Sequence, residues 1–140
     1  MAGLRLWHPA SMLFLIPFLL AALPATAETP LSPAEFESYT TGKTLTYSAG
    51  GIPFGIEEYL PGRRVRWSYL DGQCEDGEWY PAGDMIFSVY DAFPEHQCWT
   101  FFLEGGGLMA RFENDPDSTE LYETHQSREA MQCLGPKVGV

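Results

Sequence analysis

The residues of this chain best suited to chemistry are three cysteines: Cys74, Cys98 and Cys133. In an oxidising compartment two of them can form a disulfide, and the third must then remain a free thiol. The residues alone leave all three pairings open. A reactive thiol needs a cationic neighbour that lowers its pKa, and His96 lies two residues before Cys98 on the same face of a predicted strand. We favour the other interpretation, in which Cys98 packs beside Trp99 like a small hydrophobic side chain.

The carboxylate of Glu58 is the second candidate for chemistry. If Pro61-Gly62 is a two-residue loop between two strands, Glu58 faces Val65 on a side of the hairpin that also carries Trp67 and Tyr69. Burial without a cationic partner would raise the pKa of Glu58, as an acid–base catalyst or a ligand anchor requires. These three side chains, Glu58, Trp67 and Tyr69, are therefore the predicted ligand-binding residues.

Two alternatives for this hairpin remain open. A longer loop would shift the register by one residue, which would turn Glu58 to solvent and bring Glu57 inward beside Tyr59. Alternatively, Arg64 or Arg66 could point into the interior and form an ion pair with Glu58 that has only a structural role.

No pattern in the sequence favours a metal or a cofactor. The run FENDPDSTE (residues 112–120) gathers oxygen ligands, but it lacks the spacing of an EF-hand, and Asp115 to Ser118 is typical of a type I turn. His96 and His125 have no partner at the spacing of a metal site. Residues 105–107 are three glycines, but they precede a strand rather than a helix, which argues against phosphate binding. We expect no metal and no cofactor.

The elements that would position these residues are mostly strands. From Lys43 onward, turn residues recur about every eight to twelve positions, which is typical of an all-β protein. Eight strand-like runs lie between the turns: TLTYSA, FGIEEYL, RRVRWSYL, CEDGEWYP, DMIFSVY, HQCWTFFLE, LMARFEN and TELYETH. Short consecutive connections favour an antiparallel meander that closes into a barrel and so removes its edges.

One short helix is predicted before the strands, in LSPAEFESYTTGK (residues 31–43). Ser32 is a natural N-cap, and Glu35 three residues later completes a capping box. Phe36 and Tyr39 give the helix one apolar side. The predicted fold class is therefore all-β: a small antiparallel meander or barrel of about eight strands with one short N-terminal helix, lipocalin-like by analogy of architecture.

Residues 1–27 have the form of a secretory signal peptide. Arg5 supplies the positive charge, residues 12–23 (MLFLIPFLLAAL) form the apolar region, and Ala25-Thr26-Ala27 is a cleavage signal. This apolar run is shorter than the ~20 residues of a membrane-spanning helix. We expect cleavage after Ala27, a single β domain over residues 28–140 without a membrane anchor, and a location in the periplasm or outside the cell.

The charge of the chain restricts its partners. The formal net charge is −11, and removal of Arg5 with the signal peptide would make it −12. Nucleic acids and anionic membrane surfaces require clustered Lys and Arg, so the sequence argues against both. A solvated acidic surface is favoured over a cationic partner.

The run MIFSVYDAFPEHQCW (residues 85–99) predicts a hairpin. A four-residue loop from Asp91 to Pro94 would pair Tyr90 with Glu95 and would place Phe87 directly opposite Cys98.

Several strings of the sequence resemble an uncharacterised family of small exported alphaproteobacterial proteins. They are TGKTLTYSAGG, FGIEEYLPGRRVRWSYLDGQCEDGEWYPAGD, CWTFF and the tail CLGPKVGV, and the resemblance covers nearly all of residues 28–140. The family usually carries a cysteine where this chain has Phe87. The resemblance implies one disulfide within the hairpin and a second between Cys74 and Cys133, which would leave Cys98 here as a free thiol. It implies no activity.

Three functions are consistent with these features. The first is a small-ligand-binding or interaction module, whose partner is a small apolar ligand or a periplasmic protein. The second is a small hydrolase or isomerase that uses an interior carboxylate. The third is a protein-interaction or inhibitor domain that uses exposed loops. An eight-stranded barrel can hold one small ligand or be filled by its own side chains, so architecture alone does not choose between them.

Overall fold

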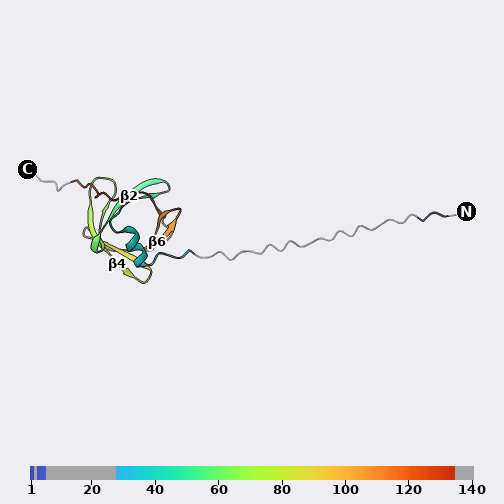
Figure 1. Ribbon diagram of the computed structural model, residues 1–140, viewed down its shortest axis with the longest axis horizontal. Coiled ribbons are helices and arrows are strands. Elements are labelled where there is room, and N and C mark those ends of the chain that lie inside the picture. Colours follow the sequence, from blue (N-terminus) through green and yellow to red (C-terminus); the bar gives the residue numbers. More distant parts are fainter. Residues whose placement is uncertain (2, 6–27, 135–140) are drawn as a thin grey trace, which may run out of the picture.

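The computed structural model describes residues 1, 3–5 and 28–134. The apolar run and the cleavage signal of the predicted signal peptide lie outside the described residues. From Thr44 onward the chain forms eight antiparallel strands, in which each pairs with the next and the last pairs with the first to close a barrel (Figure 1). The strands are β1 (Thr44–Ala49), β2 (Ile52–Leu60), β3 (Arg64–Ser68), β4 (Glu75–Ala82), β5 (Met85–Tyr90), β6 (Phe93–Glu104), β7 (Gly107–Phe112) and β8 (Leu121–Ser127). The predicted all-β barrel with one short helix is confirmed.

The helix α1 (Pro33–Thr40) closes one end of the barrel. Its capping box forms as predicted, with the Ser32 hydroxyl accepting from the Glu35 backbone N–H and the Glu35 carboxylate accepting from the Ser32 N–H. In Figure 1 the helix lies within the ring of strands. No helix in the described part of the chain has the length and apolar character needed to span a bilayer.

Phe36 is the side chain by which α1 enters the barrel. It is 1% exposed, and its ring packs against Phe101, Trp79 and Tyr59 at centroid distances of 4.4, 5.2 and 5.6 Å. Burial of such a side chain stabilises the fold by about 1.5–3 kcal/mol. The end of the barrel that faces α1 is therefore a packed core.

Glu123 on β8 fastens α1 to the barrel. Its Oε2 accepts hydrogen bonds from the Tyr39 hydroxyl and from the backbone N–H of Leu108 on β7, both at 2.8 Å. β7 and β8 pair through only two residue pairs, so the side chain of Glu123 adds a link between them where the ladder is short.

The register between β2 and β3 corrects the position predicted for Glu58. Leu60 pairs with Arg64, one residue further along than a two-residue loop would give, and Glu58 therefore pairs with Arg66. The cause is a three-residue loop, η1 (Pro61–Arg63), in which Gly62 and Arg63 have φ of 75° and 60°. Three-residue hairpin loops commonly end in such left-handed residues. The predicted interior position of Glu58 is wrong: the register is shifted by one residue, as in the alternative, and Glu57 turns inward. Glu58 faces outward but is not solvated as that alternative expected, since it is 5% exposed and bonds the backbone of Met131.

The register between β5 and β6 places Phe87 opposite Cys98, as predicted. The loop itself differs from the prediction, because Tyr90 pairs with Phe93 rather than with Glu95. A bulge between Ser88 and Tyr90 takes up the difference and restores the expected pairing further along the strands.

All three cysteines lie in the described residues. Cys74 and Cys133 form a disulfide with a Cα–Cα distance of 5.7 Å, which is the pairing that the resemblance implies. The backbone N–H of Leu134 donates to the carbonyl of Gly72 at 2.7 Å. The disulfide and this bond hold the C-terminal segment against the β3–β4 connection.

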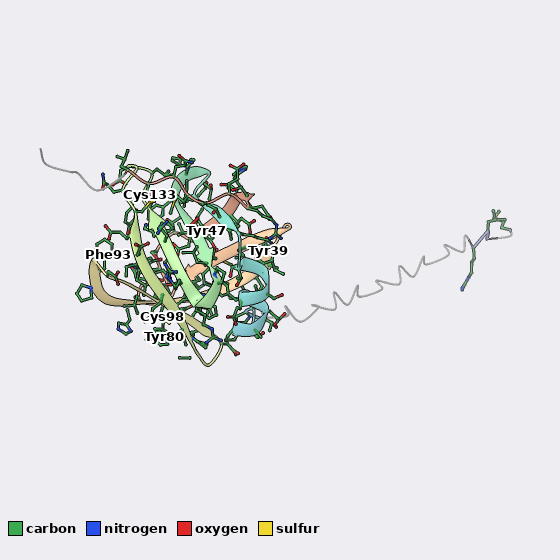
Figure 2. All side chains as sticks on the ribbon, turned by 60° about the vertical axis from the view of Figure 1, so that its left-hand side comes forward. Tyr39, Tyr47, Tyr80, Phe93, Cys98 and Cys133 are labelled. Atoms are coloured by element: carbon green, nitrogen blue, oxygen red, sulfur yellow. A yellow bond between two sulfur atoms is a disulfide. The ribbon has the colours of Figure 1, made fainter. Side chains whose placement is uncertain are left out.

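Cys98 is the free cysteine, and it lies on the outer face of the barrel with Tyr80 nearby (Figure 2). Its sulfur contacts the sulfur of Met85 at 3.1 Å, and Tyr80 stacks on Phe87 next to it. Burial, and then the nearby carboxylate of Glu113, raise the pKa of the thiol. His96 hydrogen-bonds to the Tyr80 hydroxyl rather than to the sulfur. These surroundings favour an inert thiol.

A prediction follows from the pairing of Phe87 with Cys98. Alkylation of the unfolded, non-reduced protein should label one thiol per chain, and peptide mapping should place the label at Cys98. The variant Phe87→Cys should form the second disulfide on folding and show no labelled thiol, whereas the matched control Phe87→Ala should keep one. Two labelled thiols in Phe87→Cys, with Phe87→Ala folded and labelled once, would contradict the register.

Candidate functional site

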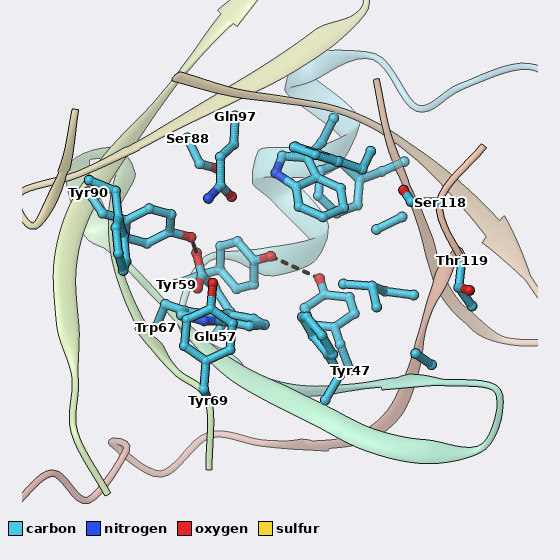
Figure 3. A pocket seen from close by; sticks show the side chains of 18 residues that line it. Tyr47, Glu57, Tyr59, Trp67, Tyr69, Ser88, Tyr90, Gln97, Ser118 and Thr119 are labelled. Carbon is cyan, nitrogen blue, oxygen red and sulfur yellow. Dashed lines mark hydrogen bonds between the residues drawn. The ribbon is translucent and has the colours of Figure 1, made fainter. Parts of the chain in front are cut away.

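A cavity of about 430 Å³ occupies the barrel on the side away from α1. Figure 3 looks into it and shows α1 behind its floor. This volume lies within the range of about 300–1,000 Å³ that is typical of small-molecule sites. At this end large aromatic side chains stand around the wall, and no helix or loop of the described residues fills the space between them.

Aromatic rings form most of one wall. Trp67 and Tyr69 on and just after β3 pack edge to face at 5.3 Å, and Phe54 on β2 lies 6.1 and 5.8 Å from them. Trp99 and Phe112 line the cavity from β6 and β7, with 4.9 Å between their ring centroids. Phe54 and Tyr69 are about half exposed, so the aromatic wall extends to the mouth.

Glu57 is the carboxyl group of this cavity. The register of β2 turns it inward, and the residue is 3% exposed. The hydroxyl of Tyr90 donates to its Oε1 at 2.8 Å, while Oε2 is buried and has no hydrogen-bond partner in the described part of the chain. Burial raises the pKa of Glu57 to about 8, and the bond from Tyr90 opposes this shift without cancelling it. Glu57 therefore keeps its proton at neutral pH in the absence of a partner.

Two further phenols lie beside Glu57 (Figure 3). The hydroxyls of Tyr47 on β1 and Tyr59 on β2 are 2.9 Å apart. Each hydroxyl group carries one proton, and only one of these two protons can lie in the hydrogen bond between the two oxygens. The other proton is therefore free to be donated to a further acceptor. Burial raises the pKa of Tyr47, Tyr59 and Tyr90 well above the ordinary value for tyrosine. All three are neutral hydrogen-bonding groups.

Besides Glu57 Oε2, a second buried polar atom without a hydrogen-bond partner in the described chain belongs to Trp67. Its indole Nε1 is buried and donates to no acceptor among the residues that the structure describes. A Cβ on Gly55 would collide with the six-membered ring of this indole, so the absence of a side chain at Gly55 gives Trp67 its position. Buried polar groups without hydrogen bonds are uncommon in proteins, and two of them line the same cavity here.

The predicted site residues are placed as follows. Trp67 and Tyr69 line the cavity as predicted, and their role in binding stays a prediction. Glu58 lies on the outer face, where its Oε2 accepts from the backbone N–H of Met131 at 2.8 Å and its Oε1 lies 3.8 Å from Arg66. Arg66 in turn bonds Asp76 at 2.8 Å. Glu58 is therefore a link between the barrel wall and the C-terminal segment.

Sequence reasoning did not select Tyr47, Tyr59 or Tyr90, and it named Glu57 only as the product of a shifted register. The signal that could have identified the inner face of β2 is that Glu57 and Tyr59 are two residues apart and so share one face. Which face of the strand points inward can be told only once the length of the loop after β2 is known.

The acidic run near residues 114–120 forms a turn. The backbone N–H of Ser118 donates to the carbonyl of Asp115 at 3.0 Å, which confirms the turn predicted there. The side chain of Asn114 bonds the backbone of Cys98 and of His96 on β6. Within the described residues, no group of three or more His, Cys, Asp or Glu side chains is arranged to hold a metal ion.

Comparisons with known protein families, with curated proteins and with solved structures find no match for this chain.

The buried carboxyl of Glu57 predicts a dependence of stability on pH. The unfolded chain ionises Glu57 near its ordinary pKa of 4.5, but the folded protein holds the proton until about pH 8. The free energy of unfolding should therefore fall as pH rises through this window, by at most about 5 kcal/mol. Denaturant unfolding at several pH values measures this fall.

The variant Glu57→Gln should lack this part of the pH dependence, because the amide does not ionise. Glu78→Gln, at an exposed position on β4, is the matched control and should keep the wild-type slope. Equal slopes for the wild type and Glu57→Gln between pH 5 and 8 would contradict the assignment.

Proposed function

We propose that this protein is an exported small-molecule-binding protein of the periplasm or the extracellular space, and that its ligand occupies the barrel cavity. The observation that carries the proposal is the cavity itself: an open, largely aromatic cup lined by Glu57 and Trp67, each of which has one buried polar atom without a hydrogen-bond partner among the described residues. Small-molecule sites commonly combine an apolar lining with a few placed polar groups. The disulfide between Cys74 and Cys133 supports an oxidising compartment.

An acid–base enzyme is the alternative that Glu57 itself favours. A carboxyl with a pKa of about 8 holds a proton at neutral pH and could act as a general acid. The described residues that line the cavity include no Cys, His, Lys or Arg, and the phenols near Glu57 remain protonated. A proton-transfer role would therefore rest on Glu57 alone, which is why we favour binding.

Dye binding to the wild type and to a variant with a partly filled cavity tests this proposal. N-phenyl-1-naphthylamine, a dye that is neutral at pH 7 and fluoresces in apolar surroundings, should bind the wild type saturably. Ala110 is buried and lines the cavity, so Ala110→Phe should fill part of the space and weaken dye binding at least tenfold.

The matched control is Ala82→Phe, which adds the same side chain at an exposed position at the end of β4. It should bind the dye as the wild type does. Thermal unfolding of both variants checks that they are folded. Absence of saturable binding to the wild type, or equal dissociation constants for folded Ala110→Phe and Ala82→Phe, would contradict a ligand site in the cavity.

A further inference from the structure

The two ends of the barrel differ in charge. Four connections surround the mouth: residues 50–51, 69–74, 91–92 and 113–120. They contain six acidic residues and no Lys or Arg. Asp71, Asp91, Asp115 and Asp117 are exposed, so the mouth presents negative charge to solvent.

The described basic residues of the barrel domain lie elsewhere. Lys43, Arg63, Arg64 and Arg128 are at the end closed by α1, where Arg63 also pairs with Glu37 at 3.2 Å. Arg66 and Arg111 lie on the barrel wall and pair with Asp76 and Glu120. Arg111 therefore neutralises one of the six acidic residues at the mouth, Glu120, and no other described Lys or Arg forms an ion pair with those six or with Glu57.

The floor of the cavity continues this pattern. Among the described residues Glu57 has no cationic partner, and its Oε2 accepts no hydrogen bond from them. Around it stand the rings of Trp67, Tyr69 and Phe54, whose faces carry negative electrostatic potential. Acidic side chains at the rim, aromatic faces along the wall and a carboxyl group at depth all favour the same sign of charge in a ligand.

We propose that the ligand of this cavity is an organic cation: an amine, protonated at neutral pH, attached to an apolar body. This inference rests on the proposed binding function and names its ligand class. The ammonium group would form an ion pair with Glu57, and the aromatic wall would offset the loss of its hydration through cation–π contacts. The acidic mouth would raise the local concentration of cations and speed their entry.

Binding of such a ligand is coupled to proton release. The titratable groups that interact with Glu57 are the phenols of Tyr47 on β1, Tyr59 on β2 and Tyr90 on β5, and burial keeps all three protonated. Glu57, with its pKa of about 8, is therefore the group that changes charge when the cation arrives. At pH 7 about 0.9 proton per site should leave, because roughly nine-tenths of Glu57 is protonated before binding.

The test uses three compounds with one apolar body and different head groups: 4-phenylbutan-1-amine, 4-phenylbutan-1-ol and 4-phenylbutanoate. Titrations of the folded wild type followed by NMR should show the amine binding at least tenfold more tightly than the alcohol, and the carboxylate binding most weakly. Calorimetry of the amine at pH 7 in two buffers of different ionisation enthalpy should show the release of nearly one proton.

Glu57→Gln separates the role of the charge from that of the shape. The variant keeps the size of the side chain, so it should bind the alcohol as the wild type does, lose the preference for the amine and release no proton. Glu58→Gln, on the outer face, should keep the preference. Equal affinities of the wild type for amine and alcohol, tighter binding of the carboxylate, or an undiminished preference for the amine in Glu57→Gln would overturn the proposal.

The outcome also separates this inference from the proposed function. If the neutral dye binds in the cavity and is blocked by Ala110→Phe, but the wild type does not prefer the amine, the cavity binds ligands of another class. If neither the dye nor any of the three compounds binds the wild type, both the binding function and its ligand class are rejected.

Discussion

The register between β2 and β3 determines which of two adjacent glutamates lies inside the barrel. Side chains alternate across a strand, so a shift of one residue exchanges the inner and outer faces. The three-residue loop η1 sets this register and turns Glu57 inward with Tyr59. The character of the cavity depends on that choice, since Glu57 is the group that binds Tyr90 and titrates far from its ordinary pKa.

The same choice gives Glu58 a structural role. On the outer face it accepts the backbone N–H of Met131 and lies near Arg66, so it holds the C-terminal segment that the Cys74–Cys133 disulfide also fixes. Both carboxyl groups are buried, but Glu58 meets a backbone donor and lies near Arg66, whereas Glu57 has no cationic partner among the described residues. The partners that each buried carboxyl group meets, rather than its residue type, decide its chemical character.

The helix α1 makes the barrel asymmetric. Phe36 enters one end and packs against rings from three strands, so that end is filled by the chain itself. Within residues 28–134 no helix or strand covers the other end, where the cavity opens between the aromatic wall and the acidic connections. The fold thus separates a packed core at one end from an open cavity at the other.

Much of this fold could be predicted from the sequence. Recurring turn residues and a capping box are local signals, and they predicted the eight strands and α1 correctly. The pairing of Phe87 with Cys98 was also correct, although a bulge compensated for an error in the loop. The inner face of β2 could not be predicted, because it depends on one loop residue. Pro61-Gly62 suggested a two-residue loop, but Arg63 also belongs to the loop and has a left-handed backbone conformation. A sequence predicts that conformation reliably only where it has a glycine.

The central claim is that Glu57 is a buried carboxyl group without a cationic partner, and its titration tests this most directly. Carbon-detected NMR of the folded protein, with the side-chain carboxyl carbon assigned through Glu57→Gln, measures the pKa of this group. The account predicts a midpoint near 8. A midpoint near the ordinary value of 4.5 would show that Glu57 is solvated or paired with a cation, and would contradict the site described here.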